Sequence, residues 1–120
     1  MPHEAILNSS TGFHTSQLVL GDRYGASCSP DIVNNLAMLI SKNGLHASRN
    51  IPFSGAYIVQ KYGRPELNRH AIQLEIDRSM YMDEQKIQKL EKFFKLKNKL
   101  LNILRDFSKT HASITSIAAE

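Results

Sequence analysis

The residues that could do chemistry are most densely placed between positions 70 and 78. The alternation of apolar and polar side chains there predicts a β-strand over residues 71–77, with a histidine just before it and an arginine just after it. The polar face of this strand carries three residues suited to hydrogen bonding or proton transfer: Gln73, Glu75 and Asp77. Charged groups inside a strand cost free energy unless they have partners or a chemical role. Glu75 is therefore either a functional carboxylate or one half of an ion pair with Arg64 or Arg78.

The segments before this strand predict an α/β fold. Residues 17–20 form a short apolar run typical of a strand, and residues 29–44 have the capping signals and apolar spacing of a helix. Residues 45–49 predict the next strand. This order of strand, helix and strand favours a parallel unit with a right-handed crossover. Residues 54–63 fit either a strand or a short helix, and we favour the short helix.

The C-terminal part is expected to be one long helix. Asp83 is a suitable N-cap, and an apolar stripe opposite a lysine-rich face continues from Glu84 to about Phe107. The sequence therefore predicts a single α/β domain divided into four parts: residues 1–16 as a poorly ordered lead-in, 17–84 as the α/β part, 85–109 as the amphipathic lysine-rich helix and 110–120 as a frayed tail.

Composition excludes several classes of protein. The net charge of +4 is concentrated in the lysine-rich helix, and a solvated helix face explains it better than a binding site. The aromatic residues of that helix lie on its apolar stripe, so the platforms that stack on nucleic-acid bases are absent and an RNA-binding module is disfavoured. No apolar run reaches the length of a membrane span, and the single Cys28 suits a reducing compartment. We expect a cytoplasmic protein with no membrane or nucleic-acid partner.

Four sequence blocks, taken in order, resemble the N-formylglutamate amidohydrolase family, also called N-formylglutamate deformylases. The blocks are Gly-Asp-Arg-Tyr-Gly-Ala-Ser-Cys at 21–28, Asn-Ile-Pro-Phe-Ser-Gly-Ala-Tyr-Ile at 50–58, Tyr-Gly-Arg-Pro at 62–65 and a fourth from His70 to Met82. The resemblance covers about half of the chain. It implies an α/β fold similar to zinc carboxypeptidases, with a mixed or parallel sheet, flanking helices and a long C-terminal helix. It also implies zinc-assisted hydrolysis of N-formyl-L-glutamate to formate and L-glutamate.

The resemblance implies roles for six residues. It favours Glu75 as the catalytic carboxylate, which takes a proton from water and delivers it to the leaving nitrogen. N-formylglutamate has two carboxylates, and guanidinium groups bind carboxylates in two-pronged fashion. The implied substrate-binding residues are Arg64, Arg78, His70, Tyr57 and Arg23. The structural alternatives for the arginines include ion pairs of Asp22 with Arg23 and of Asp77 with Arg78. We reject Cys28 as a nucleophile because no base lies near it in the sequence.

The departure from the family concerns the metal. Family members are roughly twice as long, about the length that one large α/β domain needs. Their presumed zinc ligands lie upstream of the matching blocks, the last in an Asp-x-His-Ser-Met-Pro segment, whereas this chain opens with Met1-Pro2. None of its histidines has ligand spacing: His3, His14, His46, His70 and His111. We therefore expect a resemblance to the C-terminal half only and no zinc bound by this chain alone. We also expect self-association or pairing with the missing half, and the alternative function is a non-catalytic remnant that acts as an oligomeric or partner subunit.

Overall fold

The structure, a computed structural model, describes residues 1–7 and 16–111. Its centre is a three-stranded sheet in the order β2-β1-β3. The strands are β1 (Leu18–Gly21), β2 (Ala47–Arg49) and β3 (Gln73–Ile76). β1 runs parallel to β2 and antiparallel to β3, so the sheet is mixed. The predicted parallel unit is confirmed, because α2 (Pro30–Lys42) connects β1 to β2.

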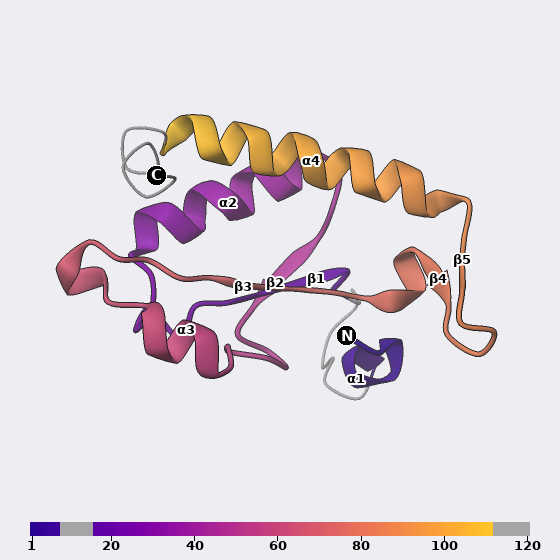
Figure 1. The fold of residues 1–120 in the computed structure, drawn as a ribbon, viewed down its shortest axis with the longest axis horizontal. Coiled ribbons are helices and arrows are strands. Elements are labelled where there is room, and N and C mark those ends of the chain that lie inside the picture. Colours follow the sequence, from indigo (N-terminus) through magenta and orange to yellow (C-terminus); the bar gives the residue numbers. More distant parts are fainter. Residues whose placement is uncertain (8–15, 112–120) are drawn as a thin grey trace.

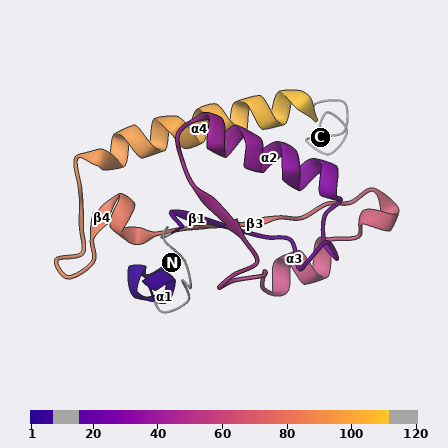
Figure 2. The ribbon, with the colours of Figure 1, turned by 180° about the vertical axis from the view of Figure 1, so that it is seen from behind.

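Helices lie on both sides of the sheet (Figure 1). On one side lie α2 and α4 (Lys92–Thr110), and on the other lie α1 (His3–Leu7) and α3 (Tyr57–Tyr62). The view from behind shows the same two layers (Figure 2). The main core is formed between the sheet and the first pair of helices, and its fully buried members include Leu18, Leu20, Val33, Ile40 and Ile103.

The register of β1 and β3 shows which of their side chains point into this core and which point to the opposite face of the sheet. Leu20 of β1 lies opposite Leu74, and both join the core with α2 and α4. Because successive side chains of a strand point to opposite faces, the alternate pair of Val19 and Glu75 points to the face covered by α1 and α3. The polar residues of β3 are therefore placed together on the side of the sheet away from the main core.

Part of the N-terminal segment, which the sequence predicts as a poorly ordered lead-in over residues 1–16, is helical. Its first part forms α1, in which the Ile6 side chain is 1% exposed. This helix is held by distant contacts, since the N–H of Arg78 donates to the carbonyl oxygen of Met1 at 2.9 Å. Contacts across such a separation leave no local pattern in the sequence. Residues 8–15 lie outside the described part of the chain.

The C-terminal helix begins eight residues later than the sequence predicts, at Lys92 and not at Glu84. A hairpin of two short strands precedes it: β4 (Met82–Asp83) and β5 (Gln88–Lys89). Asp83 does not cap a helix; its Oδ1 accepts hydrogen bonds from the N–H groups of Gln85 and Lys86, each at 3.0 Å. The same side-chain chemistry serves helix caps and turns, so the residue type alone did not separate the two. Of the predicted tail, only Thr110 and the residue after it are described.

The short segments between α3 and the hairpin are partly 3-10 helical. α3 confirms the short helix favoured for residues 54–63. One 3-10 turn follows it at Pro65–Leu67, and another follows β3 at Arg78–Met80. None of the described helices is long and apolar enough to cross a membrane.

Candidate active site on the polar face of the sheet

A buried pair of polar side chains fixes the corner where β1 and β2 end. The amide of Asn50 donates from Nδ2 to Oδ1 of Asp22 at 2.8 Å, and its Oδ1 accepts from the N–H of Asp22 at 3.1 Å. Both residues are less than 10% exposed. Asn50 has a φ of 64°, in the left-handed region that asparagine tolerates better than most residues. Asp22 is therefore bound to Asn50, and the structure does not show the alternative of an ion pair between Asp22 and Arg23.

The loop after Asn50 lies directly against the end of β1. A Cβ atom added to Gly21 would be 2.8 Å from the backbone nitrogen of Gly55 and 2.8 Å from the carbonyl carbon of Ser54. Only glycine permits this approach of two backbones. The loop and the start of β3 enclose a small pocket of about 250 Å³, lined by Pro52, Phe53, Ser54, Gly55, Ala56 and Gln73.

Gln73 connects this loop to Glu75. Its side-chain Oε1 accepts a hydrogen bond from the N–H of Ala56 at 2.8 Å, and its Nε2 donates to Oε1 of Glu75. The Glu75 side chain is 27% exposed, and its Oε2 lies 3.8 Å from the amino group of Met1. Neither Arg64 nor Arg78 pairs with Glu75, so the structural alternative of an arginine ion pair is not found.

Asp77 lies two residues after Glu75 on the same face and contacts the ring of His3. It is 4% exposed, and its Oδ2 lies 2.7 Å from Nδ1 of His3. Its other oxygen accepts from the N–H of Ser79 at 2.9 Å. Asp77 therefore pairs with His3, and the structural alternative of an ion pair between Asp77 and Arg78 is not found.

Among the three arginines predicted to bind substrate, Arg23 lies closest to the loop pocket. Its N–H donates to the carbonyl of Ser54 at 2.8 Å, and its Cγ is 3.3 Å from where a Cβ on Gly55 would lie. Arg64 donates instead from Nη1 to the carbonyl oxygens of Gln60 and Gly63, both at 2.8 Å, which caps the end of α3. The side chain of Arg78 is exposed beyond the far end of β3.

The other two predicted substrate residues also have definite places. Tyr57 begins α3 directly after the loop; it is 67% exposed, and the Lys61 ammonium lies 5.7 Å from its ring centroid. His70 lies at the other face of the sheet, where its Nδ1 accepts from the N–H of Ser29 at 3.1 Å and its Nε2 is 3.1 Å from Oδ1 of Asn68. It thereby satisfies a donor at the start of α2, whose N-cap side chain makes no such bond. The structure does not bring His70 to Glu75.

Two residues of the site had no predicted role: His3 and Asn50. The strand alternation predicted that Gln73 shares the face of Glu75, and the structure adds its bond to the N–H of Ala56. His3 could not be predicted, because it lies 74 residues from its partner Asp77. Asn50 stands in a sequence block that was recognised, but the block does not reveal its bond to Asp22.

Cys28 is not poised for nucleophilic chemistry. It is fully buried, and burial, reinforced by the negative charge of Asp22, raises the pKa of its thiol from 9.0 to about 11. A thiol with such a pKa is almost entirely protonated at neutral pH, and the thiolate is the reactive form. This agrees with its exclusion as a nucleophile from the sequence.

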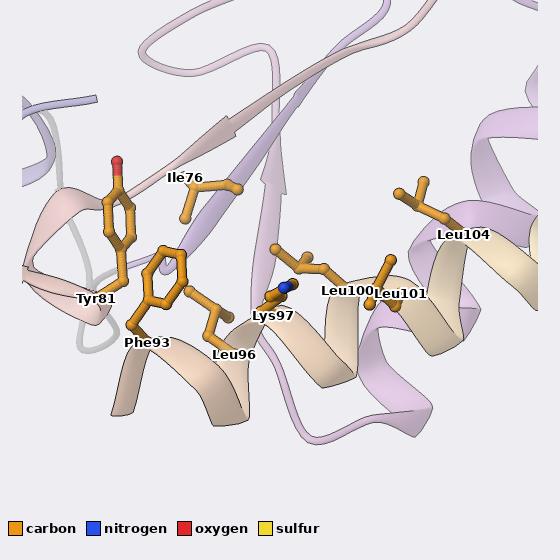
Figure 3. Close-up of a pocket in the computed structure, with 8 residues that line it drawn as sticks. All are labelled: Ile76, Tyr81, Phe93, Leu96, Lys97, Leu100, Leu101 and Leu104. Atoms are coloured by element: carbon orange, nitrogen blue, oxygen red, sulfur yellow. The ribbon is translucent and has the colours of Figure 1, made fainter. Parts of the chain in front are cut away.

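A second candidate site, an apolar groove between α4 and β3, has the wrong chemistry for an anionic substrate. Figure 3 shows the rings of Tyr81 and Phe93 at one end of this groove and Leu104 at the other. Its volume is about 380 Å³, and its lining offers the Lys97 ammonium as the one charged group among aliphatic and aromatic side chains. The groove lies on the face of the sheet opposite Glu75, since Ile76 lines it.

The described residues do not fit a zinc site. Across residues 1–7 and 16–111, no group of three or more His, Cys, Asp or Glu side chains is arranged to hold a metal ion. A protein zinc site needs three or four such ligands. We therefore assign no step of the chemistry to a metal held by these residues.

Comparison with known proteins decides the family. The family model for N-formylglutamate amidohydrolase matches residues 1–82, which is more than half of the chain. The chain belongs to the N-formylglutamate amidohydrolase family. The four sequence blocks and the mixed α/β fold are thus explained by membership of this amidohydrolase family.

Two curated relatives are N-formylglutamate deformylases. The one from Pseudomonas aeruginosa is 42% identical over 67 residues, which are 55% of this chain and 25% of the relative. The one from Pseudomonas putida is 38% identical over 66 residues, which are 54% of this chain and 25% of the relative. The matched part of this chain therefore spans a quarter of the length of either relative.

A solved structure shares the fold. The crystal structure of an N-formylglutamate amidohydrolase from Ralstonia eutropha JMP134 matches this chain with a TM-score of 0.83 and 31% sequence identity. The match covers 94% of this chain and 41% of that chain. The arrangement of strands and helices described above is therefore that of part of an N-formylglutamate amidohydrolase.

Proposed function

We propose that this chain carries the proton-transfer part of an amidohydrolase site that hydrolyses the formamide bond of N-formyl-L-glutamate to formate and L-glutamate. The observation that carries the proposal is the place of Glu75. Its carboxylate stands on the polar face of β3, one of its oxygens is held by Gln73, and it has no arginine partner. Membership of the family and the similarity to two N-formylglutamate deformylases support the choice of substrate.

Glu75 acts in this proposal as the general base. Because Gln73 donates to Oε1, the oxygen that accepts a proton from the attacking water is Oε2, which lies 3.8 Å from the Met1 amino group. The water oxygen adds to the formyl carbon, and Glu75 passes the proton to the amide nitrogen as the carbon–nitrogen bond breaks. The products are formate and the free amino group of L-glutamate. This sequence uses each atom of the water once and leaves the carboxylate as it began.

The loop pocket beside Gln73 is the proposed place for the substrate. The side chain of Arg23 packs against Gly55, which lines this pocket. We assign the guanidinium of Arg23 to the binding of one substrate carboxylate. Arg64, Arg78, His70 and Tyr57 stay predictions as substrate residues. The carboxypeptidase-like character of the fold also stays a prediction.

The described residues supply no zinc site, so any zinc in the proposed reaction would need ligands from other residues. The resemblance implies a zinc-assisted reaction, and the described side chains do not form a zinc site. We propose that the purified chain holds no stoichiometric zinc by itself. Metal analysis of the chain after dialysis against zinc measures this directly, and one bound zinc per chain would contradict it.

The test of the function is formate release from N-formyl-L-glutamate. It is measured for the chain alone and for the chain mixed with the portion of the Pseudomonas aeruginosa relative to which it does not align. Glu75→Gln keeps the size of the side chain and removes the base, so we expect a loss of activity of about 100-fold or more. Glu66→Gln, at an exposed glutamate, is the matched control. No formate release in either setting, or equal rates for Glu75→Gln and the unaltered chain, would refute the proposal.

A further inference from the structure

The pair of Asp77 and His3 has the geometry of a proton-transfer group. Asp77 is 4% exposed, and both of its oxygens are engaged, one by Nδ1 of His3 at 2.7 Å and the other by the N–H of Ser79 at 2.9 Å. A carboxylate bound in this way cannot rotate, so it sets the orientation of the imidazole ring.

The other ring nitrogen of His3 faces no protein partner. The hydroxyl of Ser79 lies 3.3 Å from Nδ1, so both neighbours of the ring meet the same nitrogen. Among the residues that the structure describes, Nε2 has no hydrogen-bond partner, and the side chain is 40% exposed. With Nδ1 directed at Asp77, Nε2 is the ring nitrogen that is left to contact a substrate.

His3 belongs to the segment that lies on the same face of the sheet as the proposed base. Glu75 and Asp77 lie two residues apart on the same face of one extended segment, a separation of about 7 Å between their Cα atoms. The segment that carries His3 crosses this face, since the Met1 amino group is 3.8 Å from Oε2 of Glu75. The N–H of His3 itself donates to Oε1 of Glu84 at 2.9 Å, which fixes its backbone.

We propose that His3 is a second proton-transfer residue of this site and that the proton needed by the leaving nitrogen comes from His3, in place of direct transfer from Glu75. The proposal rests on the proposed function. Glu75 takes one proton from water as the water oxygen bonds to the formyl carbon. His3 enters this step with a proton on each ring nitrogen, gives the Nε2 proton to the amide nitrogen as the carbon–nitrogen bond breaks, and keeps Nδ1 hydrogen-bonded to Asp77. The proton on Glu75 then returns to His3, so the two residues are restored and the products are unchanged.

The structural alternative is that the pair only holds α1 against the sheet. The two interpretations differ in their dependence on the leaving group. An amide needs protonation of its nitrogen, whereas a p-nitrophenolate leaves without a proton. A proton donor is therefore required for N-formyl-L-glutamate and not for p-nitrophenyl formate. A residue that acts through structure alone affects both substrates equally.

The kinetic test compares the two substrates for His3→Gln, with His46→Gln as the control at another exposed histidine. It uses whichever preparation releases formate, the chain alone or its mixture with the remainder of the relative. We expect His3→Gln to lower kcat about 100-fold on N-formyl-L-glutamate and less than about threefold on p-nitrophenyl formate. In His3→Gly, added imidazole should restore the amide reaction in part. Equal losses on both substrates without imidazole rescue would overturn the proposal.

A second measurement separates this proposal from the proposed function. Nuclear magnetic resonance follows the ring of His3 and the side-chain amide of Gln73 in the full chain while N-formyl-L-glutamate is added. We expect both signals to shift and that of His46 to stay. A shift at Gln73 without one at His3 overturns the role of His3 and leaves the role of Glu75 intact. No shift at either residue overturns both.

Discussion

The side-chain amide of Gln73 joins the carboxylate of Glu75 to the backbone N–H of Ala56. One end of this amide thus holds the proposed base, and the other holds the loop that lines the pocket beside it. The geometry of the base and the geometry of the pocket are therefore set by one residue, and a change there should affect both.

Gln73→Leu tests this coupling. The substitution removes the donor to Glu75 and the acceptor for the loop, and a hydrogen bond to a charged group contributes roughly 1.5–3 kcal/mol. We expect kcat for formate release to fall about tenfold or more, because Glu75 is no longer oriented. Gln60→Leu, at an exposed glutamine of α3, is the control. An unchanged kcat in Gln73→Leu would show that the bond does not matter to the reaction.

Asn50→Ala should destabilise the fold. The substitution leaves the carboxylate and N–H of Asp22 without their buried partner, which costs roughly 1–3 kcal/mol. It also places alanine at a φ of 64°, which adds strain. Urea unfolding measures the change, and Asn98→Ala, at an exposed position of α4, should stay within about 0.5 kcal/mol of the unaltered chain. Equal stability of the two variants would contradict the role of Asn50.

Gly21→Ala should displace the loop. Its new Cβ would meet backbone atoms of Ser54 and Gly55 at 2.8 Å, and backbone cannot move aside as a flexible side chain can. We expect the amide resonance of Ala56 to shift and formate release to fall. Gly25→Ala is the control, because a Cβ there meets nothing within 4 Å although its φ of 88° is strained. If both variants left the Ala56 resonance in place, the close approach at Gly21 would be unimportant.

Cys28 should react slowly with iodoacetamide at pH 8 in the folded chain and rapidly once urea unfolds it. Burial raises the pKa of its thiol to about 11, so little thiolate is present at pH 8. The pKa is higher in the folded state than its ordinary value of 9.0, so the thiol favours folding below pH 9. This contribution is lost as pH rises from about 9 to about 11. Rapid alkylation of the folded chain at pH 8 would argue against this environment.

Local signals in the sequence predicted the first half of the sheet. The start of α2 at Pro30 and its end near Asn43 are each signalled by residues within one helical turn of that end. Both ends of the helix can therefore be predicted from the sequence without knowledge of the fold. The strand that carries Glu75 was predictable for the same reason, because the alternation of apolar and polar side chains is a local pattern. The catalytic role of Glu75 remains a prediction.

Contacts between distant segments were not predictable in this way. The order of α1 depends on Arg78 and Asp77, which lie more than 70 residues away along the chain. The antiparallel pairing of β3 with β1 follows from the path of the intervening chain, and no residue type specifies it. The hairpin before α4 was missed because Asp83 suits a turn as well as a cap.

The order of the strands has a consequence for how firmly the proposed base is held. Among the described residues, β1 is paired with a strand on each side, whereas β3, which carries Glu75, is paired with a strand on one side and meets only the Met1 segment, at Ile76, on the other. Amide hydrogens of β3 that point outward should therefore exchange with deuterium faster than those of β1. Within the described sheet, Glu75 thus lies on an edge strand. A ligand that stabilises this strand should slow the deuterium uptake of the backbone amides of β3.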